Sequence, residues 1–181
     1  MNYLDLSTLK TLGTPAYFGL GFIQLKINDT QRIHFWVPEW PTIPGADNEL
    51  HDHRYTLTST ILKGEIHNQI FAPLPTPAPT HELIEVSCKP NASEIPTVID
   101  RVTPVFLTSF VSKVGDTYTL SPDAFHMAHT VGPTVTFVER GNVIKEMARV
   151  MRPCNSAFVC PFSIQYSAQQ CWDKIEEICA A

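Results

Sequence analysis

The stretch HDHRYTLTSTILKGEI, residues 51–66, places two histidines one residue apart at the start of a run of β-forming side chains. In an extended strand, residues i and i+2 point to the same side and lie about 6.5–7 Å apart along the chain. The imidazoles of His51 and His53 are therefore expected on one face, where both can approach a metal ion to about 2.0–2.1 Å. Because composition alone predicts about 0.27 such pairs, a metal site also requires a second ligand segment.

The sequence on both sides of the histidine pair predicts short strands joined by turns. Residues 54–62 are rich in Thr, Ile and Leu and predict a strand, which a turn at 63–65 connects to a returning strand at 66–71. Residues 17–27 and 31–37 flank Asn28-Asp29-Thr30 and predict a hairpin. The proline-rich stretch 72–80 predicts an exposed loop that does not lie inside a sheet.

The rest of the chain continues the β pattern, with fifteen prolines spread over the sequence. Further strands are expected at 81–88, 102–111, 116–120, 124–130 and 134–141, while 144–152 fits a strand or a helix. This pattern predicts an all-β protein, either a sandwich or a barrel.

The C-terminus departs from the β pattern. Ser167 and Gln170 form a capping-box signature, and Trp172, Ile175 and Cys179 recur at helical spacing. We expect a helix over about 167–180, packed outside a β-barrel that spans about 17–152. No boundary divides the chain, so residues 1–181 are expected to form a single domain.

Composition limits the classes of partner. A formal net charge of −5 argues against nucleic acid, and no apolar run approaches the roughly 18 residues that span a membrane. The N-terminus lacks the pattern of a signal peptide, which predicts a cytoplasmic protein whose five cysteines are reduced thiols.

The second ligand segment is SPDAFHMAHT, residues 121–130. In a strand, His126 faces one side with Ala128 and Thr130, whereas His129 faces the other side. Only one of the two histidines can therefore join His51 and His53. His126 is the first candidate and His129 the alternative.

These two segments resemble the two motifs of the cupin superfamily. His51, His53 and Gly64 match the first motif, and Gly115, Pro122 and His126 match the second. The resemblance covers roughly residues 17–141, with about 60 residues between the motifs. It implies a double-stranded β-helix, the cupin jelly-roll barrel, with a divalent metal at His51, His53 and His126.

The sequence departs from the cupin motifs at three places. Leu57 or Thr58 stands where the first motif usually has a glutamate, and Ala124 and Thr130 replace a glycine and an asparagine of the second motif. Glu49 is an alternative source of a carboxylate. Without the glutamate, the site consists of His51, His53 and His126, and this three-histidine arrangement resembles the site of the thiol, diketone and gentisate-type dioxygenases of the superfamily. Three imidazoles suit Fe(II), the metal most expected, and also Zn, Ni or Cu.

Three functions are consistent with this resemblance. The first is a metal-binding cupin that acts as a non-haem Fe(II) dioxygenase on a small molecule, with Tyr55 and His67 as candidate catalytic residues. The second is a metal-independent sugar epimerase or isomerase, in which His53 or His67 is a general base beside Tyr55 or Tyr118. The third is a non-catalytic cupin that binds a small molecule. Many cupins pair, so a homodimer is also expected.

Overall fold

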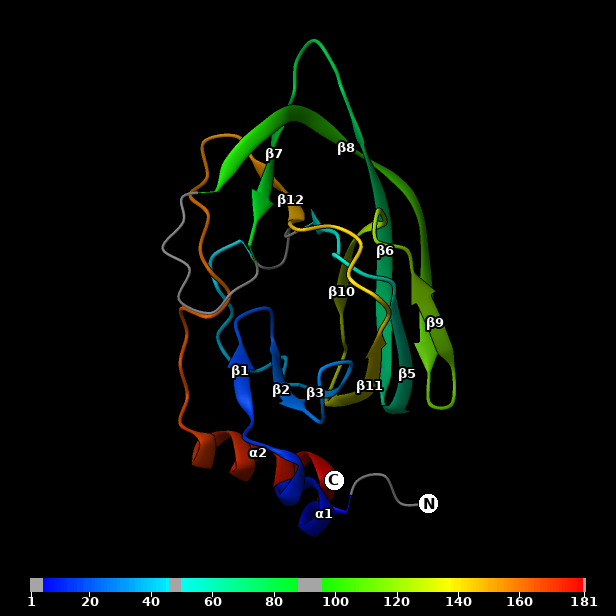
Figure 1. Cartoon of the computed structure of the whole chain (residues 1–181), viewed down its shortest axis with the longest axis vertical. Coiled ribbons are helices and arrows are strands. Elements are labelled where there is room, and N and C mark those ends of the chain that lie inside the picture. The colour runs from blue at the N-terminus through cyan, green and yellow to red at the C-terminus, as the bar shows by residue number, and fades with distance from the viewer. Residues whose placement is uncertain (1–4, 46–49, 88–95, 181) are drawn as a thin grey trace.

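Twelve strands and two helices make up the part of the chain that the computed structural model describes, residues 5–45, 50–87 and 96–180. The helices lie side by side at one end of the molecule, and the long strand β8 arches over the other end (Figure 1). The elements are α1 (Leu6–Leu12), β1 (Ala16–Phe18), β2 (Phe22–Lys26), β3 (Gln31–Trp36), β4 (Leu50–His51), β5 (Leu57–Lys63), β6 (Glu65–Leu74), β7 (His81–Val86), β8 (Thr97–Lys113), β9 (Thr117–Leu120), β10 (Phe125–His129), β11 (Thr134–Arg140), β12 (Ala148–Pro153) and α2 (Ala168–Ala180).

The strands form two sheets in which the pairs are antiparallel. The first sheet has the order β1-β2-β3-β11-β5-β9. The second has the order β10-β4-β12-β7-β8-β6, and its pairing closes because β6 also pairs with β10. The protein is therefore mostly β, as the sequence predicts.

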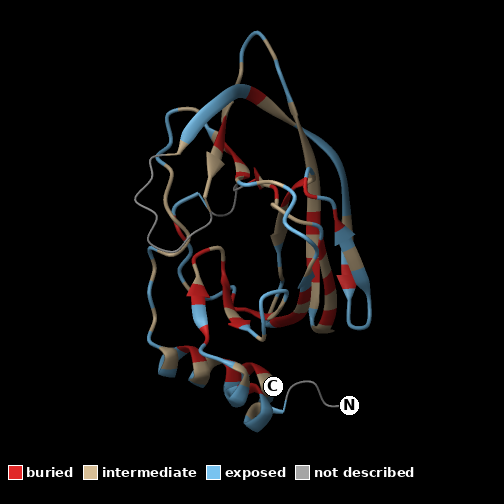
Figure 2. Ribbon diagram, in the orientation of Figure 1, coloured by how far each residue is buried: buried red, intermediate tan, exposed pale blue. Residues whose placement is uncertain are grey.

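The first sheet has two different faces. One face packs on the helices, and its core includes Ile23, Leu25 and Phe35 from the sheet with Cys171 and Ile175 from α2. The opposite face lines a cavity, described below. The alternation of buried and half-buried residues along β5 marks a strand with two unlike sides (Figure 2).

Helix α2 begins at the predicted capping box. The Ser167 backbone N–H donates to Gln170 Oε1 at 2.9 Å, and the Gln170 N–H donates to Ser167 Oγ at 3.2 Å. The buried stripe is Cys171, Ile175 and Ile178, so the helix is rotated by one residue from the predicted stripe at its two ends. Cys171 packs in the core with Tyr17, so the next residue, Trp172, lies at the edge of this core and is only half-buried.

The N-terminal helix α1 was not expected from the sequence. Asp5 accepts a hydrogen bond from the Thr8 backbone N–H at 3.0 Å and caps the helix, and Leu9 is buried. Seven residues give too few turns for a clear helical period. This helix is stabilised by the packing of Leu9 in the core of the sheet and not by the intrinsic helix propensity of its residues.

The prediction of a loop over 72–80 was wrong at its start. Strand β6 continues to Leu74, and Pro73 pairs with Pro104 of β8. Neither proline has an N–H to donate, so the two fit a position at which paired residues do not exchange hydrogen bonds. Strand β8 is also longer than expected, because it pairs first with β7 and then with β6.

The turn between β5 and β6 depends on glycine. Gly64 has a φ of 73°, and a Cβ there would lie 2.9 Å from the Pro133 carbonyl oxygen. Strands β5 and β6 belong to different sheets, so the chain changes sheet at this residue. Among the described residues, no helix is long and apolar enough to span a membrane.

Candidate metal centre

Strand pairing brings the two histidine segments together. His51 ends the two-residue strand β4, which lies between β10 and β12, and it is paired with His126 on one side and with Val150 on the other. Side chains of directly paired residues lie on the same face, about 4.5–5.5 Å apart at Cβ. His51 and His126, 75 positions apart in the sequence numbering, therefore point into the same space.

Three imidazoles converge at this point. One nitrogen from each of His51, His53 and His126 lies within 4.8 Å of the others. The ring centroids are 4.7 Å apart for His51 and His126, 5.1 Å for His53 and His126, and 5.2 Å for His51 and His53. His53 Nε2 and His126 Nε2 are 2.9 Å apart. In the described part of the chain, no carboxylate or thiol joins this cluster.

The surroundings keep the rings of His53 and His126 uncharged. Burial, followed by the neighbouring His51, lowers the pKa of His53 well below its usual value. Burial also lowers the pKa of His126, with His51 and His53 adding to the effect. A neutral imidazole is the form that binds a metal, so neither of these two ligands has to lose a proton near neutral pH before it binds one.

Asn68 of β6 orients the His126 ring. Asn68 is fully buried, and its Oδ1 lies 3.3 Å from His126 Nδ1. An amide oxygen can only accept, so Nδ1 carries the proton and the lone pair of Nε2 faces the cluster. Burial raises the pKa of Tyr118, and the neighbouring side chains of Ser59 and Asn68 oppose this rise, so Tyr118 lies close to Asn68.

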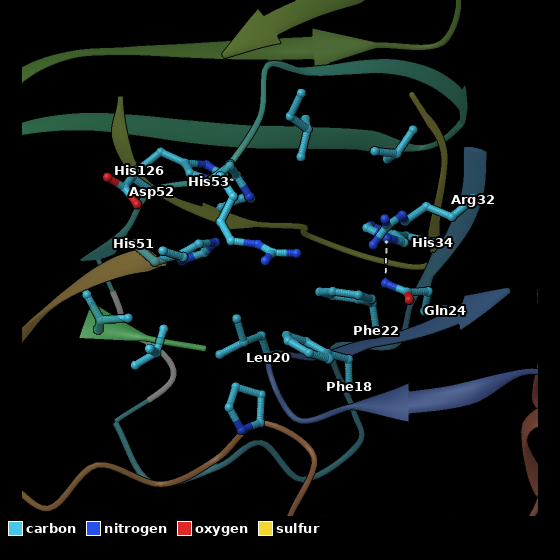
Figure 3. Close-up of a pocket in the computed structure, with 18 of the residues that line it drawn as sticks. Phe18, Leu20, Phe22, Gln24, Arg32, His34, His51, Asp52, His53 and His126 are labelled. Atoms are coloured by element: carbon cyan, nitrogen blue, oxygen red, sulfur yellow. Dashed lines mark hydrogen bonds between the residues drawn. The ribbon is translucent and has the colours of Figure 1, made fainter. Parts of the chain in front are cut away.

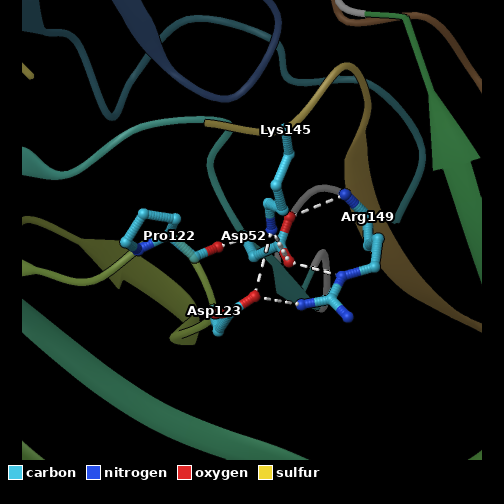
Figure 4. A network of polar contacts seen from close by, with 5 residues as sticks. All are labelled: Asp52, Pro122, Asp123, Lys145 and Arg149. Carbon is cyan, nitrogen blue, oxygen red and sulfur yellow. Dashed lines mark hydrogen bonds and ion pairs between the residues drawn. The ribbon is translucent and has the colours of Figure 1, made fainter. Parts of the chain in front are cut away.

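Asp52, between the two histidines, anchors the segment from behind. Its side chain is fully buried and accepts from Lys145 Nζ at 2.6 Å and from Arg149 Nε at 2.7 Å (Figure 4). The Arg149 backbone N–H donates to the same carboxylate at 2.7 Å. Lys145 also donates to the Pro122 carbonyl at 2.7 Å. These contacts connect the His51–His53 segment to β12 and to the loop before His126.

The cluster lies in the wall of a cavity of about 830 Å³. Figure 3 shows His51, His53 and His126 on one side and Phe22, His34 and Arg32 on another. Burial, followed by the charge of Arg32, lowers the pKa of His34 to about 3, so this ring is also neutral. Its Nε2 lies 3.3 Å from Gln24 Nε2.

The other residues singled out from the sequence have different positions. Tyr55 lines the cavity and stacks on His53, with ring centroids 5.8 Å apart. His129 is outside the cluster, and its ring packs on His67 at 5.0 Å. His67 is bonded to Glu65 Oε1 at 2.9 Å and does not line the cavity.

At the place of the missing motif glutamate, Leu57 is buried in the cavity wall and Thr58 bonds to Thr119 on the opposite face. Glu49 lies outside the described residues.

Sequence reasoning missed Asp52, Asn68 and His34. The position of Asp52 between two same-face histidines does predict that its side chain points away from them. No sequence signal identifies its partners Lys145 and Arg149, since they come from a segment about 95 residues later.

The cluster fits a divalent transition metal. Two nitrogens bound at about 2.0–2.1 Å and at right angles lie roughly 2.9 Å apart, which is the spacing of the His53 and His126 Nε2 atoms. Three imidazoles, one of them oriented by a buried amide, form a donor set typical of Fe, Zn, Ni or Cu.

No protein-family model matches the sequence, and no curated protein matches it. Among solved structures, hydroquinone 1,2-dioxygenase from Sphingomonas sp. TTNP3 with 4-hydroxybenzoate bound is similar with a TM-score of 0.34 and 11% identity, over 64% of this chain and 63% of that chain. Hydroquinone 1,2-dioxygenase PnpCD in complex with Cd²⁺ and 4-hydroxybenzonitrile has a TM-score of 0.34 and 9% identity, over 66% and 64%. The chain thus spans less than two thirds of either protein. Any functional argument depends on the geometry of the histidine cluster.

Proposed function

We propose that this chain is a metal-binding cupin, a single double-stranded β-helix domain that acts as a non-haem Fe(II) dioxygenase on a small molecule. The observation that carries the proposal is the convergence of His51, His53 and His126 in the wall of the cavity. Three ligands leave positions open for other molecules, as expected of a catalytic rather than a structural site.

In this proposal the protein residues bind the metal ion and orient its ligands. The histidines bind the ion, while Asn68 and Asp52 fix the positions of His126 and of the His51–His53 segment. An Fe(II) ion bound there supplies the redox chemistry for the use of O₂. Both oxygen atoms enter the product of a dioxygenase, so no external reductant is required. The apolar part of the cavity wall, which includes Phe22 and Trp36, limits access of water to the reacting molecule.

Metal analysis of protein purified without a histidine tag tests the proposal. We expect about one iron per chain in the wild type and almost none in a His51→Ala/His126→Ala double variant. The matched control is His129→Ala, which removes a histidine of the same strand outside the cluster. Oxygen uptake with candidate small molecules then tests for catalysis.

Two outcomes contradict the proposal. Protein that binds no divalent metal after addition of Fe(II), Zn(II), Ni(II) or Cu(II) contradicts the metal site and favours the metal-independent alternative. In that alternative, His53 and Tyr55 are a candidate pair whose rings stack, with centroids 5.8 Å apart. Protein that binds metal but takes up no oxygen and turns over no small molecule is a non-catalytic binding cupin.

We also propose that two copies of the chain pair through β8. No residue of β8 pairs with both β6 and β7, and Ile99 and Leu107 pair with neither, so one edge of the strand is open in the described structure. The arch of β8 is mostly exposed (Figure 2), and Phe106 and Leu107 are 53% and 57% exposed. Antiparallel pairing that places Asp100 opposite Lys113 of the second copy puts the two-fold axis between Phe106 and Leu107.

A further inference from the structure

The cavity wall opposite the histidine cluster is graded from aromatic to cationic. Pairing between β2 and β3 places Phe22 beside Trp36, Gln24 beside His34, and Lys26 beside Arg32. Paired residues share a face, and alternate residues of a strand share it too, so these six side chains lie on one surface. All six line the cavity.

Strand β11 extends the cationic end of this wall. Thr136 pairs with His34 and Val138 pairs with Arg32, so Arg140, two residues further on, lies on the same face beyond Arg32. Arg140 lines the cavity, and its backbone N–H donates to the Thr30 carbonyl at 2.9 Å. A side-chain contact from its Nε to the Asp29 carbonyl oxygen holds the guanidinium at this end.

These cations have no carboxylate partner among the described residues. The ion pairs of the described structure include neither Lys26, Arg32 nor Arg140. The one fully buried carboxylate of the cavity lining, Asp52, is already bonded to Lys145 and Arg149. A protein with a net charge of −5 thus has three cations outside the described ion pairs at one end of its cavity, of which Lys26 is exposed and Arg32 and Arg140 are half-buried. The exposed Asp29 also lines this end and forms none of the described ion pairs. Such a group of cations attracts an anion to the cavity.

Tyr55 connects this cationic end with the histidine cluster. The guanidinium carbon of Arg140 lies 5.4 Å from the Tyr55 ring centroid, and that of Arg32 lies 5.9 Å from it. The same ring stacks on His53. Two guanidinium groups therefore lie one aromatic ring away from a proposed metal ligand. Guanidinium groups bind carboxylates strongly because their N–H donors match the two oxygens.

The rest of the wall suits a flat apolar group. The Phe22 ring stacks on His34 with centroids 4.2 Å apart and an interplanar angle of 21°. The Phe18 ring in turn stacks on Phe22, with ring centroids 5.0 Å apart. Flat aromatic surfaces bind planar unsaturated groups through offset stacking.

We propose that this wall is a binding subsite for a planar organic carboxylate, with the carboxylate group at Arg32 and Arg140 and the unsaturated body along His34 and Phe22. The subsite extends the proposed function by naming the class of small molecule that reaches the histidine cluster. Its anion selectivity depends on the arginines and not on a bound metal.

Calorimetric titration with matched pairs of probes tests the subsite. The probes are benzoate, trans-cinnamate and 2-naphthoate, each compared with its uncharged amide, in metal-free and metal-loaded wild-type protein. We expect at least one carboxylate to bind about tenfold or more tightly than its amide in both forms of the protein. Raising the salt concentration from about 0.05 to 0.5 M should weaken binding of the carboxylate and leave the amide nearly unchanged.

Charge-removing variants locate the selectivity. Arg32→Gln/Arg140→Gln should reduce the preference for carboxylate about tenfold while binding of the amide changes less than about twofold. Arg101→Gln, an exposed arginine of β8 that does not line the cavity, is the matched control and should keep the preference. If the double variant does not fold, each single variant and the salt dependence of the wild type provide the same test.

The results that overturn the subsite are distinct from those that overturn the metal site. Equal binding of carboxylates and amides, no binding of either, or a preference that survives in the folded double variant contradicts the subsite. A carboxylate preference in a protein that binds no metal supports the subsite and contradicts only the proposed dioxygenase. A protein that binds iron but shows no preference for carboxylates over amides supports the metal site and contradicts the subsite.

Discussion

Asp52 and Lys145 form a buried ion pair of 2.6 Å directly behind the histidine cluster. Lys145 also donates to the carbonyl of Pro122, four residues before His126, so a single ammonium group touches both histidine-bearing segments. The pair therefore connects the two histidine-bearing segments, and Asp52 also lines the cavity.

The Asp52→Asn variant should lower both stability and metal affinity. Removal of the charge leaves Lys145 and Arg149 without their main partner, and loss of one member of a buried ion pair costs about 3–5 kcal/mol. Both partners are partly exposed, so we expect about 2–3 kcal/mol in urea denaturation. Asp123→Asn is the control, because Asp123 contacts the same cations but its side chain is 72% exposed. It should cost less than about 1 kcal/mol, and equal effects of the two variants would contradict a positioning role for Asp52.

The Asn68→Ala variant should weaken metal binding about 10–100-fold, because the His126 ring loses the acceptor that fixes its tautomer. Asn68→Asp keeps an acceptor at this position and should restore most of the affinity. Gln69→Ala, at the next position of β6, is the control and should bind as the wild type does. Competition with a chromophoric chelator measures the affinities. An Asn68→Ala protein that is folded and binds metal normally would show that Asn68 does not orient the ligand.

Addition of metal to chelator-treated protein should raise its melting temperature. A ligand that binds only the folded state at a concentration of 100 Kd adds about 2.7 kcal/mol of stability. The increase should be absent in His53→Ala and present in His67→Ala, since only His53 belongs to the cluster. Differential scanning calorimetry with and without Fe(II) under anaerobic conditions makes the comparison. An equal increase in both variants would place the bound metal elsewhere.

The neutral state of His34 should make the protein less stable in acid. Burial lowers the pKa of His34 from 6.5 to about 3 in the folded state, so below pH 6.5 the unfolded state binds the extra proton. This contribution to stability is complete above pH 6.5 and is lost as the pH falls toward 3, by about 1.4 kcal/mol per pH unit. His34→Gln should remove that part of the slope. Urea denaturation at pH 7, 6, 5 and 4 gives the difference, and parallel slopes for the two proteins would falsify it.

The variant Leu107→Lys should shift the proposed dimer to monomer, because it places two like charges next to the two-fold axis. Val131→Lys is the matched control: Val131 is 75% exposed and lies outside β8, so it should leave the association unchanged. Sedimentation velocity over a range of concentrations reports the oligomeric state. A wild type that is monomeric at every concentration, or a Leu107→Lys variant that still dimerises, argues against pairing through β8.

Local patterns in the sequence predicted most of the strands and the main helix. The runs around 57–63, 125–129 and 134–140 are β-forming and are bounded by turn residues, so their identity needs no tertiary information. The capping box of Ser167 and Gln170 likewise acts within one turn of helix. Helix α1 and the full length of β8 could not be predicted this way, because packing and long-range pairing stabilise them.

For the candidate site, the sequence by itself predicted that His51 and His53 project together and that only one of His126 and His129 can face them, although strand β4 ends at His51 and His53 lies in the loop that follows. These are consequences of the two-residue period of an extended chain. The tertiary structure alone decided that β4 pairs with β10 at His126, that Asp52 is bonded to Lys145 and Arg149, and that Arg32 and Arg140 lie across the cavity. The register between strands far apart in the chain sets these contacts, and a local sequence pattern carries no information about that register.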